Sequence, residues 1–315
     1  MSPTIVAEGL RKRFGDKTAL DDVDLTVSAG TVHGVLGPNG AGKTTAVRIL
    51  TTLLKLDAGH AEVAGFDVTT RPDQVRAHIG LVGQNAAVDE VLSARQNLEL
   101  FGRLYHLGTK DARARATELL DRFSLADTGN KAVKQFSGGM RRRLDLAASL
   151  LLRPRVLFLD EPTTGLDPRG RNEVWEAVRR LVREGTTVLL TTQYLDEADQ
   201  LASQISVVDH GRVIAEGSPA TLKARLGGDR LDVVLHDVAA LPEAAAIVER
   251  VAGTAPETDL DNRLVSAPVT DPLAALGDAV QALREAGLAV EDVALRRPTL
   301  DEVFLNLTGK TEVAA

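Results

Sequence analysis

A glycine-rich segment near the N-terminus constrains the fold of this chain more than any other feature. Residues 37–44 read GPNGAGKT and match the phosphate-binding pattern GxxxxGK[ST] at every fixed position. Residues 31–36 predict a buried strand before this loop, and residues 45–50 predict a helix after it. Backbone N–H groups of such a loop turn toward a polyphosphate, and the helix points its positive end at the same place. The segment therefore predicts an α/β fold built around a phosphate site.

The pattern also assigns roles to individual residues of the loop. We expect Lys43 to reach the β- and γ-phosphates and the Thr44 hydroxyl to bind Mg²⁺. A glycine-rich turn without a ligand would not need the strand and helix that flank this segment. The other positions expected to contact a nucleotide are Gly37, Pro38, Asn39, Gly40, Ala41, Gly42 and Thr45.

The composition is that of a globular protein long enough for two domains. The 315 residues are 44% hydrophobic and 26% charged, and a single core stops growing at roughly 250–300 residues. The absence of cysteine excludes disulfides and thiolate metal sites. No apolar run reaches the roughly 18 residues that span a bilayer, and no signal peptide is predicted. We therefore expect any membrane role to depend on a partner.

Charge is unevenly distributed along the chain. Residues 229–315 carry 16 acidic and 7 basic side chains, whereas the whole chain has a net charge of −7. Nucleic-acid binding requires clustered Lys and Arg, so we expect no nucleic acid as a partner. The short basic run at 141–143 is expected to face solvent or a bound nucleotide.

Hydrophobic periodicity predicts a nucleotide-binding domain over residues 4–226. Apolar runs at 156–159 and 187–190 are typical of central strands, and a helical pattern lies between them. This succession predicts a mostly parallel sheet. Residues 88–150 show helical patterns without a strand, which predicts an inserted helical subdomain.

A second, smaller domain is predicted after the glycine pair Gly227 and Gly228. Residues 229–309 follow the order βαββαβ, which predicts an accessory α+β domain of the ferredoxin-like kind. A helix is expected to follow its last strand, with Thr299 as N-cap and Glu302 placed for a capping box. This helix is expected either to contact another subunit or to pack on its own domain.

An acidic pair ends the apolar run at 156–159. At the C-terminal end of a buried strand, Asp160 is expected to hold Mg²⁺ and Glu161 to polarise an attacking water. Without a phosphate loop, the pair would indicate only a strand-ending turn with solvated carboxylates. With the loop present, the pair predicts a hydrolytic site.

A Ser-Gly-Gly turn precedes the acidic pair, within residues 136–141, FSGGMR. With the phosphate loop, the turn and the acidic pair in this order, the chain resembles the ATP-binding cassette (ABC) ATPases, whose signature is usually LSGGQ. The resemblance implies that Ser137, Gly138 and Gly139 of one subunit close over ATP held by another. These groups offer a second helix N-terminus to the γ-phosphate. Phe136 and Met140 depart from the usual pattern at flanking positions.

The resemblance extends to three further positions. Gln84 matches the family's Q-loop glutamine, which senses Mg²⁺ or water and links to the membrane partner. Asp167, within the sequence GLDP, matches the D-loop residue that crosses the dimer interface. Phe14 is placed to stack on adenine, and the alternative for an isolated phenylalanine is a position in the core.

One position departs from the family pattern. A histidine usually follows the strand that ends near residue 192, and this chain has Gln193. Its amide can hydrogen-bond a γ-phosphate oxygen but cannot carry a proton. The change implies a slower chemical step or a site that binds ATP with little turnover, and the intact Glu161 favours a working ATPase. The residues expected to take part in catalysis are Glu161, Lys43, Gln84, Gln193 and Asp167.

Gln193 and the tail sequence PTLDEVFL at 298–305 make the chain similar to the daunorubicin/doxorubicin-resistance branch of ABC exporter ATPases. The family implies a homodimer around two Mg·ATP that drives export of a drug-like or antibiotic substrate through a separate integral membrane permease. The expected location is then the cytoplasmic face of the cell membrane. Two alternatives are a nucleotide-gated regulatory module with little turnover and an ABC ATPase that acts on nucleic acid or ribosomes.

Overall fold

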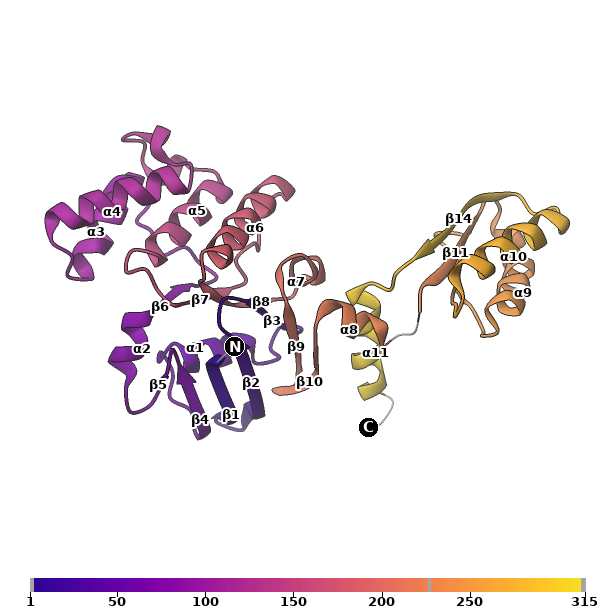
Figure 1. Ribbon diagram of the computed structural model, residues 1–315, viewed down its shortest axis with the longest axis horizontal. Coiled ribbons are helices and arrows are strands. Elements are labelled where there is room, and N and C mark those ends of the chain that lie inside the picture. Colours follow the sequence, from indigo (N-terminus) through magenta and orange to yellow (C-terminus); the bar gives the residue numbers. More distant parts are fainter. Residues whose placement is uncertain (1–2, 226–227, 313–315) are drawn as a thin grey trace. The chain divides into compact units, whose positions relative to one another are not determined.

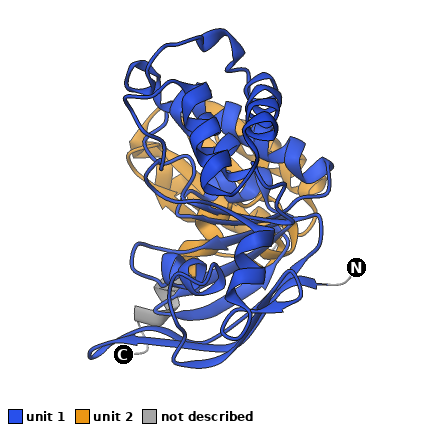
Figure 2. Ribbon diagram, turned by 90° about the vertical axis from the view of Figure 1, so that its left-hand side faces the viewer, with its two compact units in different colours: residues 1–219 blue, residues 220–315 orange. Residues whose placement is uncertain are grey.

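The chain forms two units, each described here by itself. The computed structural model describes residues 3–225 and 228–312 (Figure 1). The units are Met1–Pro219 and Ala220–Ala315 (Figure 2). Gly227, part of the expected boundary, lies outside the described residues. Among the helices of the described ranges, none is long and apolar enough to cross a membrane.

A six-stranded sheet, parallel except for one edge hairpin, runs through the first unit in the order β10-β9-β3-β8-β7-β6. Every residue of β3, β7 and β8 is buried, as expected for strands covered on both faces. The predicted mostly parallel sheet is confirmed. Its strands are β3 Val32–Leu36, β6 Ile79–Val82, β7 Val156–Asp160, β8 Thr187–Thr192, β9 Gln204–Asp209 and β10 Arg212–Gly217.

The first unit also contains an antiparallel sheet, with the order β2-β1-β4-β5, whose strands β1, β4 and β5 the periodicity does not predict. Several register shifts between β1 and β2 interrupt the strict alternation by which strands are recognised in a sequence. Helix α1, Lys43–Leu50, lies between the two sheets and buries Val47, Ile49 and Leu50 in their shared core (Figure 1). The strands are β1 Pro3–Phe14, β2 Lys17–Ser28, β4 Ala58–Val63 and β5 Phe66–Asp67.

Helices α3, α4 and α5 form the expected helical insertion between β6 and β7 (Figure 1). Helix α3 begins with a complete capping box, in which Ser93 and Gln96 each accept the other's backbone N–H. The helices of the first unit are α1, α2 Pro72–His78, α3 Ala94–Leu104, α4 Thr109–Arg122, α5 Gly138–Ser149, α6 Pro168–Arg183 and α7 Leu195–Leu201, with 3₁₀ turns at Ala126–Thr128 and Val133–Gln135; α8 Pro219–Ala224 leads into the second unit.

A buried histidine on β3 makes the stability of the first unit depend on pH. His33 is buried beside Ser206, 2.8 Å from Nε2 to Oγ, and burial lowers its pKa from 6.5 to about 4. Between these values the unfolded chain binds a proton that the folded protein excludes, so stability falls as pH falls from 6.5 toward 4. Between pH 7.5 and 5 the expected loss from this group is about 2 kcal/mol.

The substitution His33→Gln tests this pH dependence, because glutamine can still bond Ser206 but does not titrate. We expect urea unfolding of the variant to lose about 2 kcal/mol less than wild type over the same pH interval. His106→Gln, at an exposed histidine, serves as the control. An equal acid-dependent loss in wild type and His33→Gln would contradict the assignment.

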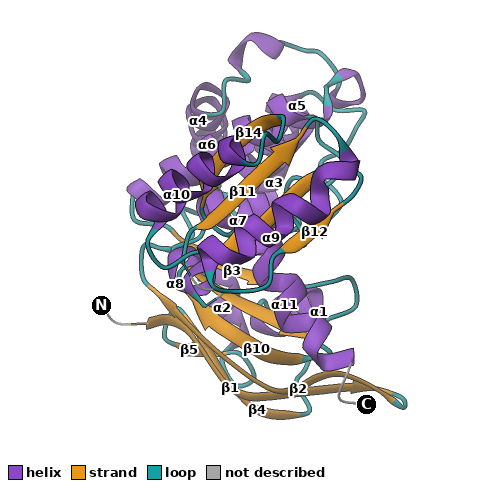
Figure 3. Cartoon of the chain, turned by 90° about the vertical axis from the view of Figure 1, so that its right-hand side faces the viewer, coloured by secondary structure: helices purple, strands orange, loops and turns teal. Residues whose placement is uncertain are grey.

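The second unit has the predicted βαββαβ order, and its antiparallel sheet runs β12-β13-β11-β14. This is the ferredoxin-like order, in which the first and third strands are central. Helices α9 and α10 pack side by side on one face of the sheet and close its apolar core (Figure 3). The elements are β11 Arg230–Leu235, a 3₁₀ turn Val238–Ala240, α9 Leu241–Ala252, β12 Glu257–Asp259, β13 Leu264–Pro268, α10 Pro272–Glu285, β14 Val290–Arg296 and α11 Leu300–Glu312.

A polar network ties the start of α11 to this sheet. The Arg296 guanidinium contacts Asp232 at 2.5 Å and both carboxylate oxygens of Glu302 at 2.7 and 2.9 Å. Thr299 and Glu302 form the predicted capping box, in which Glu302 accepts the Thr299 N–H at 2.9 Å and Thr299 Oγ1 accepts the Glu302 N–H at 3.3 Å. Leu305 is 68% exposed. The network fixes how α11 begins relative to β11 and β14.

Candidate active site

The parallel sheet brings the predicted functional segments to one edge. Strand β3 lies between β9 and β8, and β8, β7 and β6 follow as parallel neighbours. Because carboxyl ends of parallel strands meet at the same edge, the phosphate loop, Gln193, the acidic pair and the segment carrying Gln84 begin side by side. Segments up to about 160 residues apart in sequence therefore meet at one place.

A pocket of about 290 Å³ lies at this edge. It combines the phosphate loop with Gln84, Glu161 and Phe14. Phe14 is 50% exposed, so it is not a core residue. The lining residues are Phe14, Lys17, Ala19, Asn39, Gly40, Gly42, Lys43, Thr44, Thr45, Gln84 and Glu161.

Two lining residues, Lys17 and Ala19, are missing from the sequence prediction. Lys17 pairs with Phe14 across the β1–β2 turn, so both side chains belong to one hairpin. The short turn after Phe14 is the signal that could have pointed to Lys17. Gln193, by contrast, is half-buried after β8 and does not line the described pocket.

Glycines in the loop are required by its tight geometry. A Cβ on Gly37 would lie 2.2 Å from the Val208 carbonyl oxygen. Gly42, the residue before α1, has φ +109°, and a Cβ there would lie 2.5 Å from the Ala19 oxygen. Larger residues at either position would push the loop away from the strands that hold it. The loop amides are therefore fixed at the N-terminus of α1, where an anion is stabilised.

Lys43 is a buried cation at the base of the pocket, with its side chain 4% exposed. Its Nζ donates to the carbonyl oxygens of Gly37 at 2.8 Å and Pro38 at 3.1 Å, and lies 3.6 Å from Glu161 Oε1. Burial lowers the pKa of Lys43, and the neighbouring Glu161 carboxylate acts in the opposite direction. A phosphate group would be a stronger partner for this ammonium than neutral carbonyls.

Thr44 and Asp160 supply adjacent oxygen atoms beside the loop. The Thr44 hydroxyl donates to Asp160 Oδ1 at 3.2 Å, and the Thr191 hydroxyl donates to the same oxygen at 2.5 Å. Thr191 therefore holds the Asp160 carboxylate toward α1. A hydroxyl, a carboxylate and the Gln84 amide oxygen are the hard donors that Mg²⁺ prefers, so these residues fit that ion.

Glu161 is held in an unusual backbone conformation. Its φ of 51° lies in the left-handed region, which non-glycine residues avoid. Its N–H donates to the Thr191 carbonyl at 3.0 Å, and its side chain is buried at the pocket wall. Such a conformation costs of the order of 1–3 kcal/mol and persists only where surrounding contacts fix it. It aims the carboxylate at Lys43 and the pocket.

The Ser-Gly-Gly turn lies in a different pocket, of about 520 Å³. Ser137 caps α5, its Oγ accepting the Met140 N–H at 3.2 Å, so the turn is the N-terminus of that helix. Asp167 caps α6 in the same way through the Gly170 N–H at 2.8 Å. Both helix ends face this pocket, and none of its lining residues also lines the phosphate-loop pocket.

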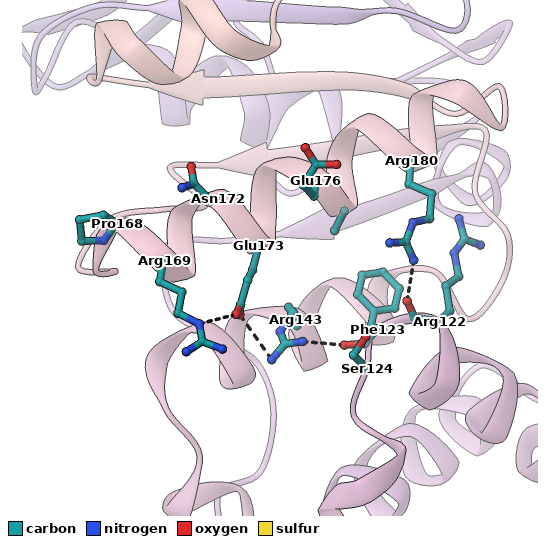
Figure 4. A pocket seen from close by; sticks show the side chains of 11 residues that line it. Arg122, Phe123, Ser124, Arg143, Pro168, Arg169, Asn172, Glu173, Glu176 and Arg180 are labelled. Atoms are coloured by element: carbon teal, nitrogen blue, oxygen red, sulfur yellow. Dashed lines mark hydrogen bonds and ion pairs between the residues drawn. The ribbon is translucent and has the colours of Figure 1, made fainter.

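A larger pocket of about 620 Å³ lies between α6, the C-terminal end of α4 and the middle of α5 (Figure 4). Its lining includes Glu173, whose carboxylate forms ion pairs with Arg169 at 3.2 Å and with Arg143 at 3.4 Å. These three residues also line the pocket of the Ser-Gly-Gly turn. The larger pocket contains neither phosphate loop nor acidic pair, so size alone does not locate the nucleotide site.

Comparison with known proteins decides the family. The family model of the ABC transporter matches residues 20–164. The chain is 67% identical to "Daunorubicin resistance ATP-binding protein DrrA3" of Streptomyces coeruleorubidus, over 97% of this chain and 96% of that one. It belongs to the daunorubicin/doxorubicin-resistance family of ABC ATPases. The family resemblance predicted from the sequence motifs is thereby confirmed.

A more distant sequence relative and a solved structure also resemble this ABC ATPase. It is 38% identical to "Nod factor export ATP-binding protein I" of Ralstonia nicotianae, over 98% of this chain and 95% of that one. The structure of the ATP-binding cassette MJ0796 as a dimer bound to ADP and Pi matches with a TM-score of 0.61 and 26% identity. That match covers 68% of this chain and 98% of the other. The chain is therefore the ATPase of an ABC transporter.

Gln193 gives a prediction specific to this branch of ABC ATPases. If its amide contacts the γ-phosphate, Gln193→Ala removes one hydrogen bond, and a bond of about 0.5–1.5 kcal/mol corresponds to a loss of about 2- to 12-fold. We expect a loss of that size in ATP turnover, ATP affinity or both, measured by phosphate release and nucleotide titration. Gln200→Ala, at an exposed glutamine of α7, is the control. Unchanged turnover and affinity in Gln193→Ala would rule out the contact.

Proposed function

We propose that two copies of this ABC ATPase enclose two Mg·ATP molecules and that their closure and reopening drive export of a drug-like or antibiotic compound. The separation of the two pockets carries this proposal. The phosphate loop and the Ser137 turn occupy different pockets of one chain, so a second copy is needed to bring a turn onto bound nucleotide. The related cassette solved as a dimer bound to ADP and Pi supports pairing of two copies in the presence of nucleotide.

Each chemical role of an ABC ATPase falls to a residue of this chain. Lys43 and the loop amides bind the β- and γ-phosphates, while Thr44, Asp160 and Gln84 hold Mg²⁺. When bound, Mg²⁺ neutralises charge on the transferring phosphoryl group. Glu161 orients and polarises the attacking water. Phe14 stacks on the adenine, and Asp167 reaches across the dimer interface from the start of α6.

Transport requires a second, membrane-spanning subunit. Apolar surface suited to such a partner is exposed on the helical insertion, where Leu100 and Leu104 lie one turn apart on α3 and Tyr105 follows. The ATPase then works at the cytoplasmic face of the cell membrane. Residues 4–226 form the nucleotide-binding domain and 229–309 an accessory domain. Relatives named for daunorubicin resistance favour an antibiotic cargo.

A cross-linking experiment tests the dimer, and the absence of native cysteine makes it direct. One preparation carries Glu161→Gln with Asn39→Cys in the phosphate loop, and the other carries Glu161→Gln with Met140→Cys beside the Ser-Gly-Gly turn. Mixed with a short bifunctional maleimide, the two should form a cross-linked dimer in Mg·ATP and not in its absence. Lys110→Cys, exposed on α4, replaces Met140→Cys in the control. A protein that stays monomeric in ATP, or a dimer that cross-links only through Lys110→Cys, would refute the proposal.

A further inference from the structure

A buried arginine on α5 joins segments from both sides of the nucleotide pocket. Arg142 is 6% exposed and lies five residues after Ser137, in the second turn of that helix. Its Nε donates to the Pro162 carbonyl oxygen at 2.6 Å, and its Nη2 donates to the Glu161 carbonyl oxygen at 3.0 Å. Its Nη1 donates to the Gly83 carbonyl oxygen at 2.6 Å. One guanidinium thus holds the backbone next to the hydrolytic glutamate and the residue before Gln84.

Asp145, one turn further along α5, bonds to the other side of the Gln84 segment, so that Arg142 and Asp145 together hold both ends of residues 83–87. Its carboxylate lies 3.4 Å from Arg142 Nη1, and its Oδ1 accepts the Ala87 N–H at 3.1 Å. One turn of α5 therefore hydrogen-bonds to both backbone positions: Arg142 donates to the Gly83 carbonyl oxygen, and Asp145 accepts the Ala87 N–H. The segment between them, which contains Gln84, is fixed at both ends by that helix.

Burying the charges of Arg142 and Asp145 costs desolvation free energy, which indicates that the pair has a role beyond packing. Arg142 and Asp145 are only 6% and 4% exposed, and burial raises the pKa of Asp145 and lowers that of Arg142. The nearby carboxylates of Glu197, on α7, and Asp160 act in the opposite direction and raise the pKa of Arg142. A buried ion pair contributes little net stability over apolar packing, whereas its directional bonds specify one geometry. Here the bonds end on backbone atoms beside Gln84 and Glu161.

We propose that Arg142 and Asp145 are positioning residues for ATP hydrolysis, which couple the helix that begins at the Ser-Gly-Gly turn to Gln84 and Glu161. The left-handed backbone of Glu161 needs contacts that fix it, and Arg142 holds its carbonyl while Thr191 holds its N–H. Because α5 is one rigid element, a shift of Ser137 toward nucleotide on a second copy moves the Gly83, Ala87 and Glu161 backbones with it.

Arg115 provides a matched control inside the same unit. It is 9% exposed and also donates to backbone carbonyls, those of Leu150 at 2.7 Å and Leu151 at 3.3 Å, and it pairs with Glu118 at 2.5 Å. These contacts join α4 to the end of α5 and reach no segment of the nucleotide pocket. Arg115→Gln therefore reports the effect of losing a buried arginine without the proposed positioning role.

The test compares the double variant Arg142→Gln/Asp145→Asn with Arg115→Gln, in the full chain. The paired neutral substitutions avoid leaving a buried charge without its partner. They remove the guanidinium bonds to the carbonyl oxygens of Gly83 and Glu161, while an asparagine at position 145 can still accept the Ala87 N–H. We expect kcat for ATP to fall about 10- to 100-fold in the double variant, with KM and ATP affinity changed less than about twofold. In Arg115→Gln, kcat should stay within about twofold of wild type at a similar loss of Tm.

Hydrogen exchange and a conservative variant keep the test independent of folding yield. Amides at 84–87 should exchange faster in the double variant than in wild type or Arg115→Gln. Arg142→Lys keeps the charge beside Asp145 but cannot span three carbonyls, so we expect kcat between those of wild type and the double variant at unchanged KM. The proposal is overturned if Arg142→Lys has wild-type kcat, or if the Arg142 and Arg115 variants lose kcat in equal proportion to their loss of Tm.

Discussion

Glu161→Gln is expected to lower phosphate release from ATP by about 10²- to 10⁴-fold while the protein still binds ATP. Glutamine keeps the size and the hydrogen-bonding reach of the side chain but cannot take a proton from the attacking water. The backbone contacts of Glu161 with Thr191 and Arg142 do not involve the carboxylate, so they survive the change. Single-turnover phosphate release, with nucleotide affinity measured separately, distinguishes the chemical step from binding.

Glu176→Gln, at an exposed carboxylate on α6, should leave turnover unchanged and controls for the loss of one charge. If wild type and Glu161→Gln release phosphate at the same background rate, Glu161 does not perform the chemistry assigned to it. That result would also give weight to the interpretation of Gln193 as a sign of slow turnover.

Lys43→Met should weaken ATP binding by about 10- to 150-fold, because a charge-assisted bond contributes about 1.5–3 kcal/mol. The unliganded protein is expected to change little in stability, because removing a buried cation with a lowered pKa is offset by the loss of its ion pair with the buried Glu161. The removed cation is buried, bonds mainly to neutral carbonyls of Gly37 and Pro38, and has a lowered pKa. Melting curves with and without Mg·ATP measure both effects in one experiment.

At an ATP concentration about 100 times the wild-type Kd, bound ligand stabilises wild type by about 2.7 kcal/mol. That increment should fall to between about 1.4 and about 0.3 kcal/mol in Lys43→Met. It should persist in Lys55→Met, which changes an exposed lysine on the way to β4. An ATP-dependent rise in Tm equal to that of wild type would show that Lys43 does not contact the phosphates.

Much of the active site could be predicted because its requirements are local. The loop that ends in Lys43 and Thr44 needs glycines at tight backbone positions, a strand before it and a helix after it, and all of these are adjacent in sequence. The acidic pair follows directly from the apolar run of β7. Thr299 and Glu302 illustrate the same point, since a capping box spans only three residues.

The unpredicted features depend on contacts between distant segments. The antiparallel sheet joins β1 to β4 across about 50 residues, and its register shifts disguise the alternation of β1. Lys17 and Ala19 enter the nucleotide pocket only because the β1–β2 hairpin lies beside the phosphate loop. The short turn after Phe14 pairs Lys17 with Phe14, but no residue type or spacing near Lys17 specifies the phosphate loop as the neighbour of this hairpin.

The sequence by itself determined the family, the phosphate loop, the acidic pair and the order of elements in the second unit. Each of these follows from residues close together in the chain, whose backbone conformations and polarity depend on their immediate neighbours. Only the tertiary structure decided which segments are held together around the nucleotide. The Arg142–Gly83 and Asp145–Ala87 bonds span 59 and 58 residues, and such pairings exist only once the sheet and the helical insertion have packed. Burial then makes them specific, because a polar group out of water must find its partner.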